Sequence, residues 1–125
     1  MEKRELEERL INFAVLIVEI VESLPETRPY KHLGGQLLRS GTSPALNYGE
    51  AQGGESRRDF IHKIKIVLEE LRETNICLKI IIRIGSSESN IKIANALKES
   101  NELISIFVKT VNTAQNNLNK QLTQS

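Results

Sequence analysis

The chain has 125 residues, a length typical of one domain, and its 17 Lys and Arg residues nearly balance 16 Asp and Glu residues. This balance excludes a global electrostatic field that would draw the protein onto nucleic acid or a membrane, so an anion-binding surface must be local. One cysteine excludes an internal disulfide, and aromatic residues, at 4% of the chain, are too few for a platform that stacks single-stranded bases.

An apolar pattern over residues 4–24 predicts the first helix. Its apolar residues recur at alternating steps of four and three and so share one face: Leu6, Leu10, Phe13, Ile17, Ile20 and Leu24. This face is widened by Ala14, Leu16, Val18 and Val21, so we expect the helix to meet more than one neighbour. Glu19 and Glu22 interrupt the apolar stretch before it reaches the roughly 20 residues of a membrane span. The first five residues, Met1 to Glu5, carry charges of both signs, so we expect no secretion signal. We therefore expect a cytoplasmic protein in a reducing compartment, without a membrane partner.

Residues 32–52 predict a second helix that is rich in glycine. Each glycine costs roughly 1 kcal/mol inside a helix. The four-three spacing nevertheless persists through Leu33, Leu37, Ser40, Pro44 and Asn47. Because proline lacks the amide hydrogen that bonds the fourth preceding carbonyl, we expect a helix that bends at Pro44.

Residues 56–84 predict a third helix, which we expect to be the longest. Ser56 resembles an N-cap, Asp59 lies in the first turn, and Gly85 would end the helix. The predicted core face contains Phe60, Ile64, Val67, Leu71, Leu78 and Ile81, broadened by Ile61, Leu68 and Ile82.

A fourth helix is predicted over residues 89–118. Its apolar positions have heptad-like spacing: Ile93, Leu97, Ile104, Phe107, Val111, Ala114 and Leu118. Beyond Asn112 the composition becomes polar, so we expect the C-terminal tail to fray. Four amphipathic helices with short connections favour a single-domain, all-α, up-and-down antiparallel four-helix bundle over residues 1–125.

The middle of the chain carries a recognisable set of residues. It begins with Gly35-Gln36-Leu37-Leu38-Arg39-Ser40-Gly41-Thr42-Ser43. It continues with Asn47, Glu50, Ser56, Arg57, every residue from Asp59 to Ile66, and then Glu70, Glu73 and Thr74. This pattern, over about residues 33–78, resembles the four-helix bundle proteins encoded in intervening sequences of bacterial 23S ribosomal RNA genes.

The resemblance implies a bundle that assembles as a ring, a homopentamer. The family is similar to the accessory protein of diversity-generating retroelements, a basic ring that engages nucleic acid and a reverse transcriptase. The present chain departs from that accessory protein in its near-zero net charge, and from the family at Ile76-Cys77, where relatives often carry aromatic residues.

Polar residues follow one face of the second predicted helix. Arg39, Ser43, Asn47 and Glu50 fall at steps of four, four and three. If the third helix packs beside this face, it can answer with charge-assisted hydrogen bonds from Ser56, Asp59 and Lys63. We interpret the set as a polar network that fixes helix register or a subunit contact, with a ligand or catalytic site as the alternative.

Four cations repeat every seven residues along the third predicted helix: Arg58, Lys65, Arg72 and Lys79. At 1.5 Å rise per residue they stand roughly 10 Å apart and form one stripe, which can neutralise phosphates of RNA or DNA. The alternative is a solvated face, or ion pairs with Glu69, Glu73 and the carboxylates of Glu5, Glu8 and Glu19.

The remaining candidates do not form a recognised reaction centre. His32 and His62 lack a second histidine at zinc-binding spacing, and Cys77 lies among apolar residues. Asp59-Phe60-Ile61-His62 only comes near the Glu-x-x-His pattern of di-metal centres, which needs two copies, and it occurs once. We therefore expect no metal, no cofactor and no enzyme activity. The leading hypothesis is a homo-oligomeric scaffold that binds nucleic acid, and the alternative is a protein-interaction or structural module without a nucleic-acid role.

Overall fold

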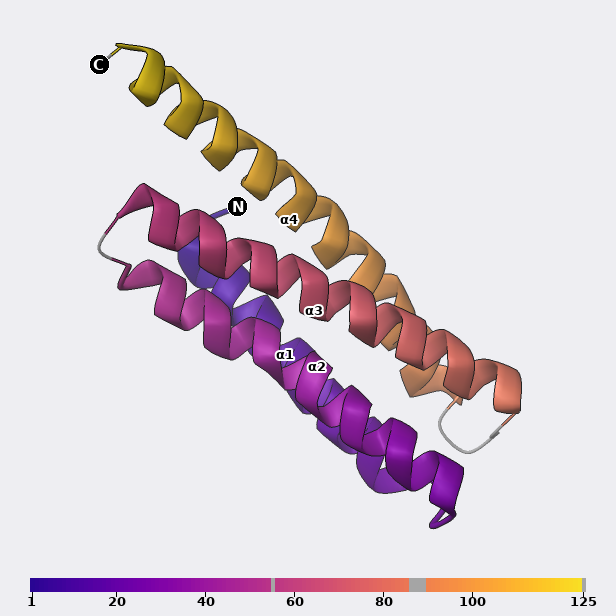
Figure 1. The fold of residues 1–125 in the computed structure, drawn as a ribbon. Helices are drawn as coiled ribbons and strands as arrows, with labels where there is room; N and C mark the ends of the chain where they lie inside the picture. Colours follow the sequence, from indigo (N-terminus) through magenta and orange to yellow (C-terminus); the bar gives the residue numbers. More distant parts are fainter. Residues whose placement is uncertain (55, 86–89, 125) are drawn as a thin grey trace.

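The computed structural model describes residues 1–54, 56–85 and 90–124, and over these ranges the chain forms helices and no strand. The helices are α1 (Lys3–Ser23), α2 (Arg28–Gln52), α3 (Arg57–Ile84) and α4 (Asn90–Gln124). Successive helices run in opposite directions, as Figure 1 shows. The predicted all-α, up-and-down arrangement of four helices is confirmed.

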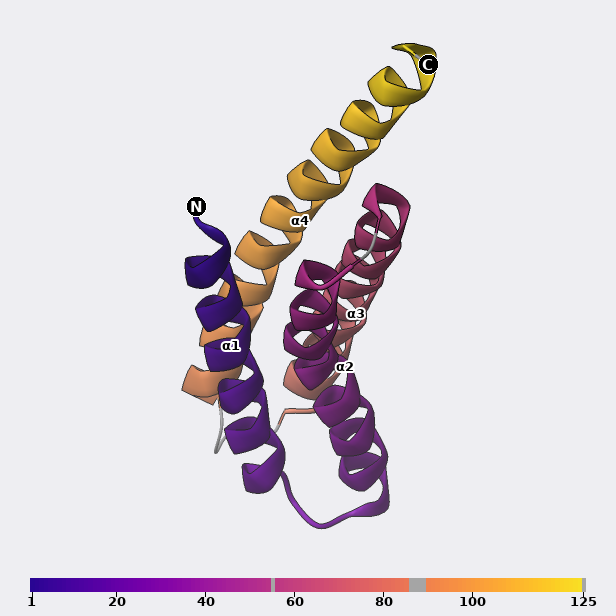
Figure 2. The ribbon, with the colours of Figure 1, turned by 90° about the vertical axis from the view of Figure 1, so that its left-hand side faces the viewer.

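Each helix packs against two others. Contacts join α1 to α2, α2 to α3 and α3 to α4, and a less extensive contact between α4 and α1 closes the bundle. Figure 2 shows α1 beside α4 and α2 beside α3. Helices α1 and α3 therefore occupy diagonally opposite corners, and both run in the same direction.

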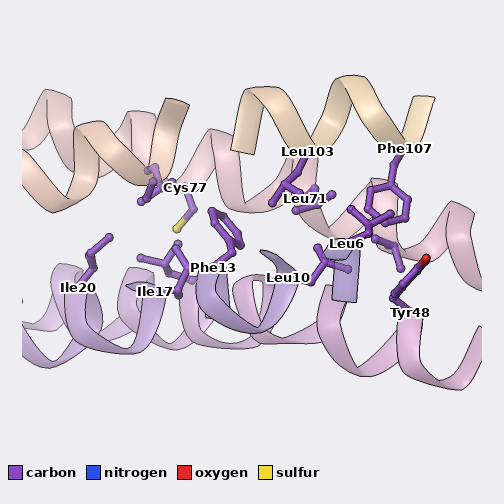
Figure 3. Packing of buried hydrophobic residues seen from close by; sticks show 14 of the residues in the cluster. Leu6, Leu10, Phe13, Ile17, Ile20, Tyr48, Leu71, Cys77, Leu103 and Phe107 are labelled. Carbon is purple, nitrogen blue, oxygen red and sulfur yellow. The ribbon is translucent and has the colours of Figure 1, made fainter. Parts of the chain in front are cut away.

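One apolar cluster fills the space between the helices (Figure 3). The five α1 residues from Leu6 to Ile20 that begin the predicted stripe are buried, together with Leu71 and Leu78 of α3. Phe107 of α4 meets Tyr48 of α2 edge to face, with ring centroids 5.6 Å apart. The core is thus mainly aliphatic, with aromatic packing near the end where α1 begins.

Helix α2 begins earlier than predicted, at Arg28 rather than residue 32. Pro29 lies in its first turn, where the missing amide hydrogen costs no helical hydrogen bond. His32 therefore lies inside the helix, where its side chain is exposed. The helix also continues through the buried Pro44.

Helix α4, with 35 residues, is longer than α3, with 28, so the expectation that the third helix is the longest was wrong. The predicted frayed tail was also wrong, because the helix continues to Gln124. Ala114 packs against the core and Leu118 is half-buried, so apolar contacts support the helix beyond the point where its composition turns polar.

The ends of α3 follow the predicted signals. The Ser56 side-chain oxygen accepts a hydrogen bond from the Asp59 backbone N–H at 3.1 Å, and Gly85 ends the helix with a left-handed φ of 93°. One core assignment was wrong: Ile82 is exposed, because it lies about 100° around the helix from the buried Ile81.

Candidate nucleic-acid interface on α3

The basic stripe lies on the outer face of α3. Arg58, Lys65, Arg72 and Lys79 are all exposed, while Ile64, Leu71 and Leu78 on the opposite face enter the core. Spacing by seven residues keeps the four cations on one side, because two turns of α-helix hold 7.2 residues. The prediction from spacing that the four cations share one side of the helix is therefore confirmed, and that side is exposed to solvent.

None of these four cations makes an ion pair within residues 1–54, 56–85 and 90–124. Two carboxylates considered as their partners are engaged elsewhere: Glu73 by Arg39 at 2.6 Å, and Glu19 by Lys92 at 3.4 Å. The stripe thus presents positive charge that the described part of the chain does not neutralise.

Two further features of this face were missed by the sequence reading. Arg83, four residues after Lys79, is exposed and extends the positive charge to the last turn of the helix. Ile76 and Ile80 are also exposed on the outer side. The signal was the four-residue spacing: Arg83 follows Lys79 by four residues, Ile76 follows Arg72 by four, and Ile80 follows Ile76 by four.

The predicted polar network forms only in part, as separate contacts between α2 and α3. Lys63 donates to Glu50 at 2.6 Å, as the spacing indicated. Arg39 instead bonds the carboxylates of Glu70 and Glu73, at 3.0 Å and 2.6 Å.

The other predicted members of the network bond within their own segments. Asn47 donates to the Ser43 hydroxyl at 2.8 Å, inside α2. Ser56 caps the Asp59 amide at the start of α3. The set therefore acts locally and does not form one buried network.

Electrostatics at the α2–α3 contact reflects partial burial. Desolvation raises the pKa of the Glu70 carboxyl, and the nearby Arg39 guanidinium opposes that shift. The pKa of Arg39 is raised, chiefly by its hydrogen bond to Glu73. The arrangement is typical of a structural ion pair at a surface.

Buried polar contacts lie at other positions, deeper in the bundle. Thr74 donates to the Ser40 hydroxyl at 2.9 Å, and Asn75 donates to the Ser100 hydroxyl at 2.8 Å and to Asn101 at 3.0 Å. Within the described ranges no buried side-chain nitrogen or oxygen lacks a partner. The core therefore offers no unsatisfied polar group to a ligand.

The N-terminal half of the stripe borders a groove between α3 and the end of α4. Arg58, His62 and Lys65 form one wall, and Gln115 and Leu118 line the other. The groove is open to solvent and measures about 310 Å³. Its cationic wall suits an anionic partner that lies along the surface better than a small molecule that must be enclosed.

Cys77 is buried on the α2 side of α3, and its thiol lies 3.4 Å from the Leu33 carbonyl oxygen. Burial raises the pKa of this thiol, which lowers the fraction of reactive thiolate. We expect iodoacetamide to alkylate the folded protein at least about tenfold more slowly than the urea-unfolded chain at the same pH. Equal rates, measured by mass spectrometry, would contradict this burial.

The described ranges contain neither a membrane-spanning helix nor a cluster of metal-binding side chains. No helix there is long and apolar enough to cross a membrane. Among the same residues, no three His, Cys, Asp or Glu side chains gather closely enough to hold a metal ion.

Comparison with known proteins identifies a family and related solved structures. The family model described as 23S rRNA-intervening sequence protein matches residues 2–109. The fold is similar to a crystal structure of a protein of unknown function from the S23 ribosomal protein family of Bacteroides thetaiotaomicron. The two share 29% sequence identity and a TM-score of 0.79, over 90% of this chain and 99% of that chain. No protein with a curated description matches the sequence.

Proposed function

Because the chain belongs to the 23S rRNA-intervening sequence protein family, we propose that it is a non-enzymatic, homo-oligomeric scaffold that binds nucleic acid through the basic stripe of α3. The ring of five copies is part of this proposal and is supported by the family resemblance over residues 33–78. The observation that carries the nucleic-acid role is the outward position of four cations that no described carboxylate pairs.

The physical basis is counterion release. A cation that contacts a phosphate displaces condensed ions, so binding weakens as salt rises. The net charge of one chain is only +1, so a single stripe attracts nucleic acid weakly. Repeating the stripe around an oligomer multiplies the contacts that one nucleic-acid molecule can make at once.

Replacing Arg58, Lys65, Arg72 and Lys79 with glutamine tests this proposal directly. If all four contact phosphates, the slope of log affinity against log salt should become shallower by about 3. Fluorescence anisotropy with a labelled RNA hairpin, repeated over a salt series, measures this slope. Unchanged affinity and slope would exclude the stripe as the binding surface.

A matched control removes the same charge elsewhere. Lys31, Lys98, Lys109 and Lys120 are exposed and lie outside the stripe, so their replacement with glutamine should leave most of the RNA affinity in place. Equal losses in the two variants would mean that net charge, and not the α3 surface, controls binding. Light scattering on the wild-type protein should give an oligomer, and a monomer at micromolar concentration would contradict the scaffold.

A protein-interaction module without a nucleic-acid role is the second candidate. The exposed pairs Ile11 and Val15 on α1, and Ile76 and Ile80 on α3, favour it, because apolar surface of this kind commonly marks protein contacts. An oligomer that ignores RNA at physiological salt would support this candidate over the first.

A further inference from the structure

The groove beside the basic stripe continues along the end of α4 toward the start of α1. A second hollow, of about 430 Å³, shares Arg58 and Leu118 with the first. A third hollow, of about 420 Å³, shares Ser56 and Arg57 with the second and reaches Lys3. The three hollows therefore form one open surface depression between the first turns of α3 and the last turns of α4, which we call the α3–α4 groove.

The charge in the α3–α4 groove has one sign. Its lining includes four cations, Lys3, Arg57, Arg58 and Lys65. The chain has 16 Asp and Glu residues, yet none of the carboxylates that the structure describes lines the groove. Nor does any of the four cations form an ion pair with another described residue. The positive charge is therefore available to a polyanion.

The α4 wall of the groove carries uncharged amides. Six of the ten residues 115–124 are Asn or Gln, and Gln115, Asn117 and Gln121 line the groove. Gln115 donates to Asn119 at 3.2 Å, whereas Asn117 and Gln121 bond no other group in the part of the chain that the structure describes. Asparagine is a poorer helix former than alanine or glutamate, so helix formation does not account for Asn117. Because Asn117 and Gln121 are one turn apart, they share a side of α4 and present two free amides to the groove.

Cations on one wall and amides on the other are complementary to an unpaired nucleotide strand. Cations hold phosphates whatever the base, whereas an amide carries both donors and an acceptor and can read the edge of a base. In a duplex the pairing edges are occupied by the opposite strand, but an unpaired strand presents them. Arg57 and Lys65 stand about 12 Å apart along α3, the length of roughly three or four stacked nucleotides at about 3.4 Å each.

We propose that the α3–α4 groove binds an unpaired stretch of nucleic acid, with phosphates on Arg57 and Arg58 and base edges on Asn117 and Gln121. This inference rests on the proposed function and deepens it, because it assigns discrimination between bases to α4. The α4 wall lies beyond residue 109, where the match to the family model ends, so the family match does not include the two amides.

Removing the two amides tests the base contacts. For labelled RNA oligomers about ten nucleotides long, made of adenosine, cytidine or uridine alone, wild-type affinities should span at least about tenfold. Asn117→Ala/Gln121→Ala should reduce this span to less than about threefold and leave the salt slope unchanged, because no phosphate contact is lost. Alanine favours the helix, and circular dichroism checks that α4 stays folded. Fluorescence anisotropy measures the affinities.

Asn112→Ala/Asn116→Ala is the matched control. These two asparagines are also one turn apart and exposed on α4, but they lie on another side of the helix from Asn117 and Gln121. The control should keep the wild-type span of affinities. A wild-type protein without base preference, an amide variant that keeps its preference, or an equal loss in the control would overturn the proposal.

Placing carboxylates in the groove tests the position of the strand. Asn117→Asp/Gln121→Glu changes the shape little and should weaken binding of the oligomers at least about tenfold, because the new charges repel phosphates. Asn112→Asp/Asn116→Asp adds the same charge outside the groove and should weaken binding less than about threefold. Equal losses would overturn the groove as the binding position.

Two other occupants are separated by the same acidic variants. A blunt-ended RNA duplex that distinguishes the two acidic variants as sharply as the oligomers do would overturn the preference for an unpaired strand. A polyglutamate peptide that displaces the oligomers at equal concentration would assign the groove to an acidic protein segment and overturn the proposal.

Failure of this inference can be told apart from failure of the proposed function. A wild-type protein that binds no RNA would overturn both. Binding that weakens when the four stripe cations become glutamine, but keeps its base preference in Asn117→Ala/Gln121→Ala, would overturn only the role of α4.

Discussion

Replacing Phe107 with alanine is expected to lower the free energy of unfolding by about 3–5 kcal/mol. Phe107 is fully buried, and its ring meets Tyr48 edge to face at 5.6 Å with an interplanar angle of 83°. Leu6 of α1 lies beside it in Figure 3, so one ring joins three helices. Alanine removes the buried surface and leaves a cavity where rigid helices cannot fully close.

Urea unfolding followed by circular dichroism measures this loss, at one protein concentration because association adds to apparent stability. Ile91→Ala is the control, because Ile91 is 79% exposed and its truncation should change the free energy of unfolding by less than about 0.5 kcal/mol. A loss below about 1 kcal/mol for Phe107→Ala would mean that this end of the core is loosely packed.

Gly41→Val is expected to destabilise the protein by about 2–3 kcal/mol, because α1 leaves no room for a side chain there. A Cβ atom at Gly41 would lie 2.6 Å from Cγ2 and 3.0 Å from Cβ of Ile17. The second distance involves the base of the side chain, which a rotamer change cannot move. The two helices would have to separate.

The same substitution at two other glycines of α2 provides matched controls. A Cβ atom at Gly35 or Gly49 would meet nothing within 4 Å, so valine there should be neutral or stabilise the helix by a few tenths of a kcal/mol. Adding Ile17→Ala to Gly41→Val should recover part of the loss, which thermal or urea unfolding of the double variant measures. Equal effects at all three glycines would contradict close packing at Gly41.

Much of the helical layout could be predicted from local patterns. The recurrence of apolar residues from Leu6 to Ile20 identifies a face that water disfavours, whatever the neighbouring helix is. Ser56 and Gly85 act on the backbone within a few residues, so the ends of α3 follow from the local sequence. The same periodicity predicted that the cations from Arg58 to Lys79 face outward.

The end of α4 shows why composition is a weaker guide than spacing. The polar residues beyond Asn112 indicated fraying, yet Ala114 and Leu118 continue the apolar spacing, and the structure has both partly buried. Polar residues between them face solvent, where they do not oppose the helix. Spacing was therefore the better predictor, because burial of one face is sufficient to support a helix.

Partners across helices could not be predicted in the same way. Arg39 pairs with Glu70 and Glu73, and Asn75 bonds Ser100. Their separation in the sequence carries no geometric information until the helices are placed side by side. The interpretation of Arg39, Ser43, Asn47 and Glu50 as one network was incomplete for this reason.

The sequence by itself determined the four helices, the face that each buries, the exposed basic stripe and the family resemblance, because these depend on periodicity and short motifs. Only the tertiary structure decided at which position a helix contact requires glycine and which carboxylates form ion pairs. It also decided which apolar side chains remain exposed to solvent. Ile11 and Gly41 show the distinction, since each is ordinary in its own helix. Their roles depend on distances between helices, and packing sets those distances.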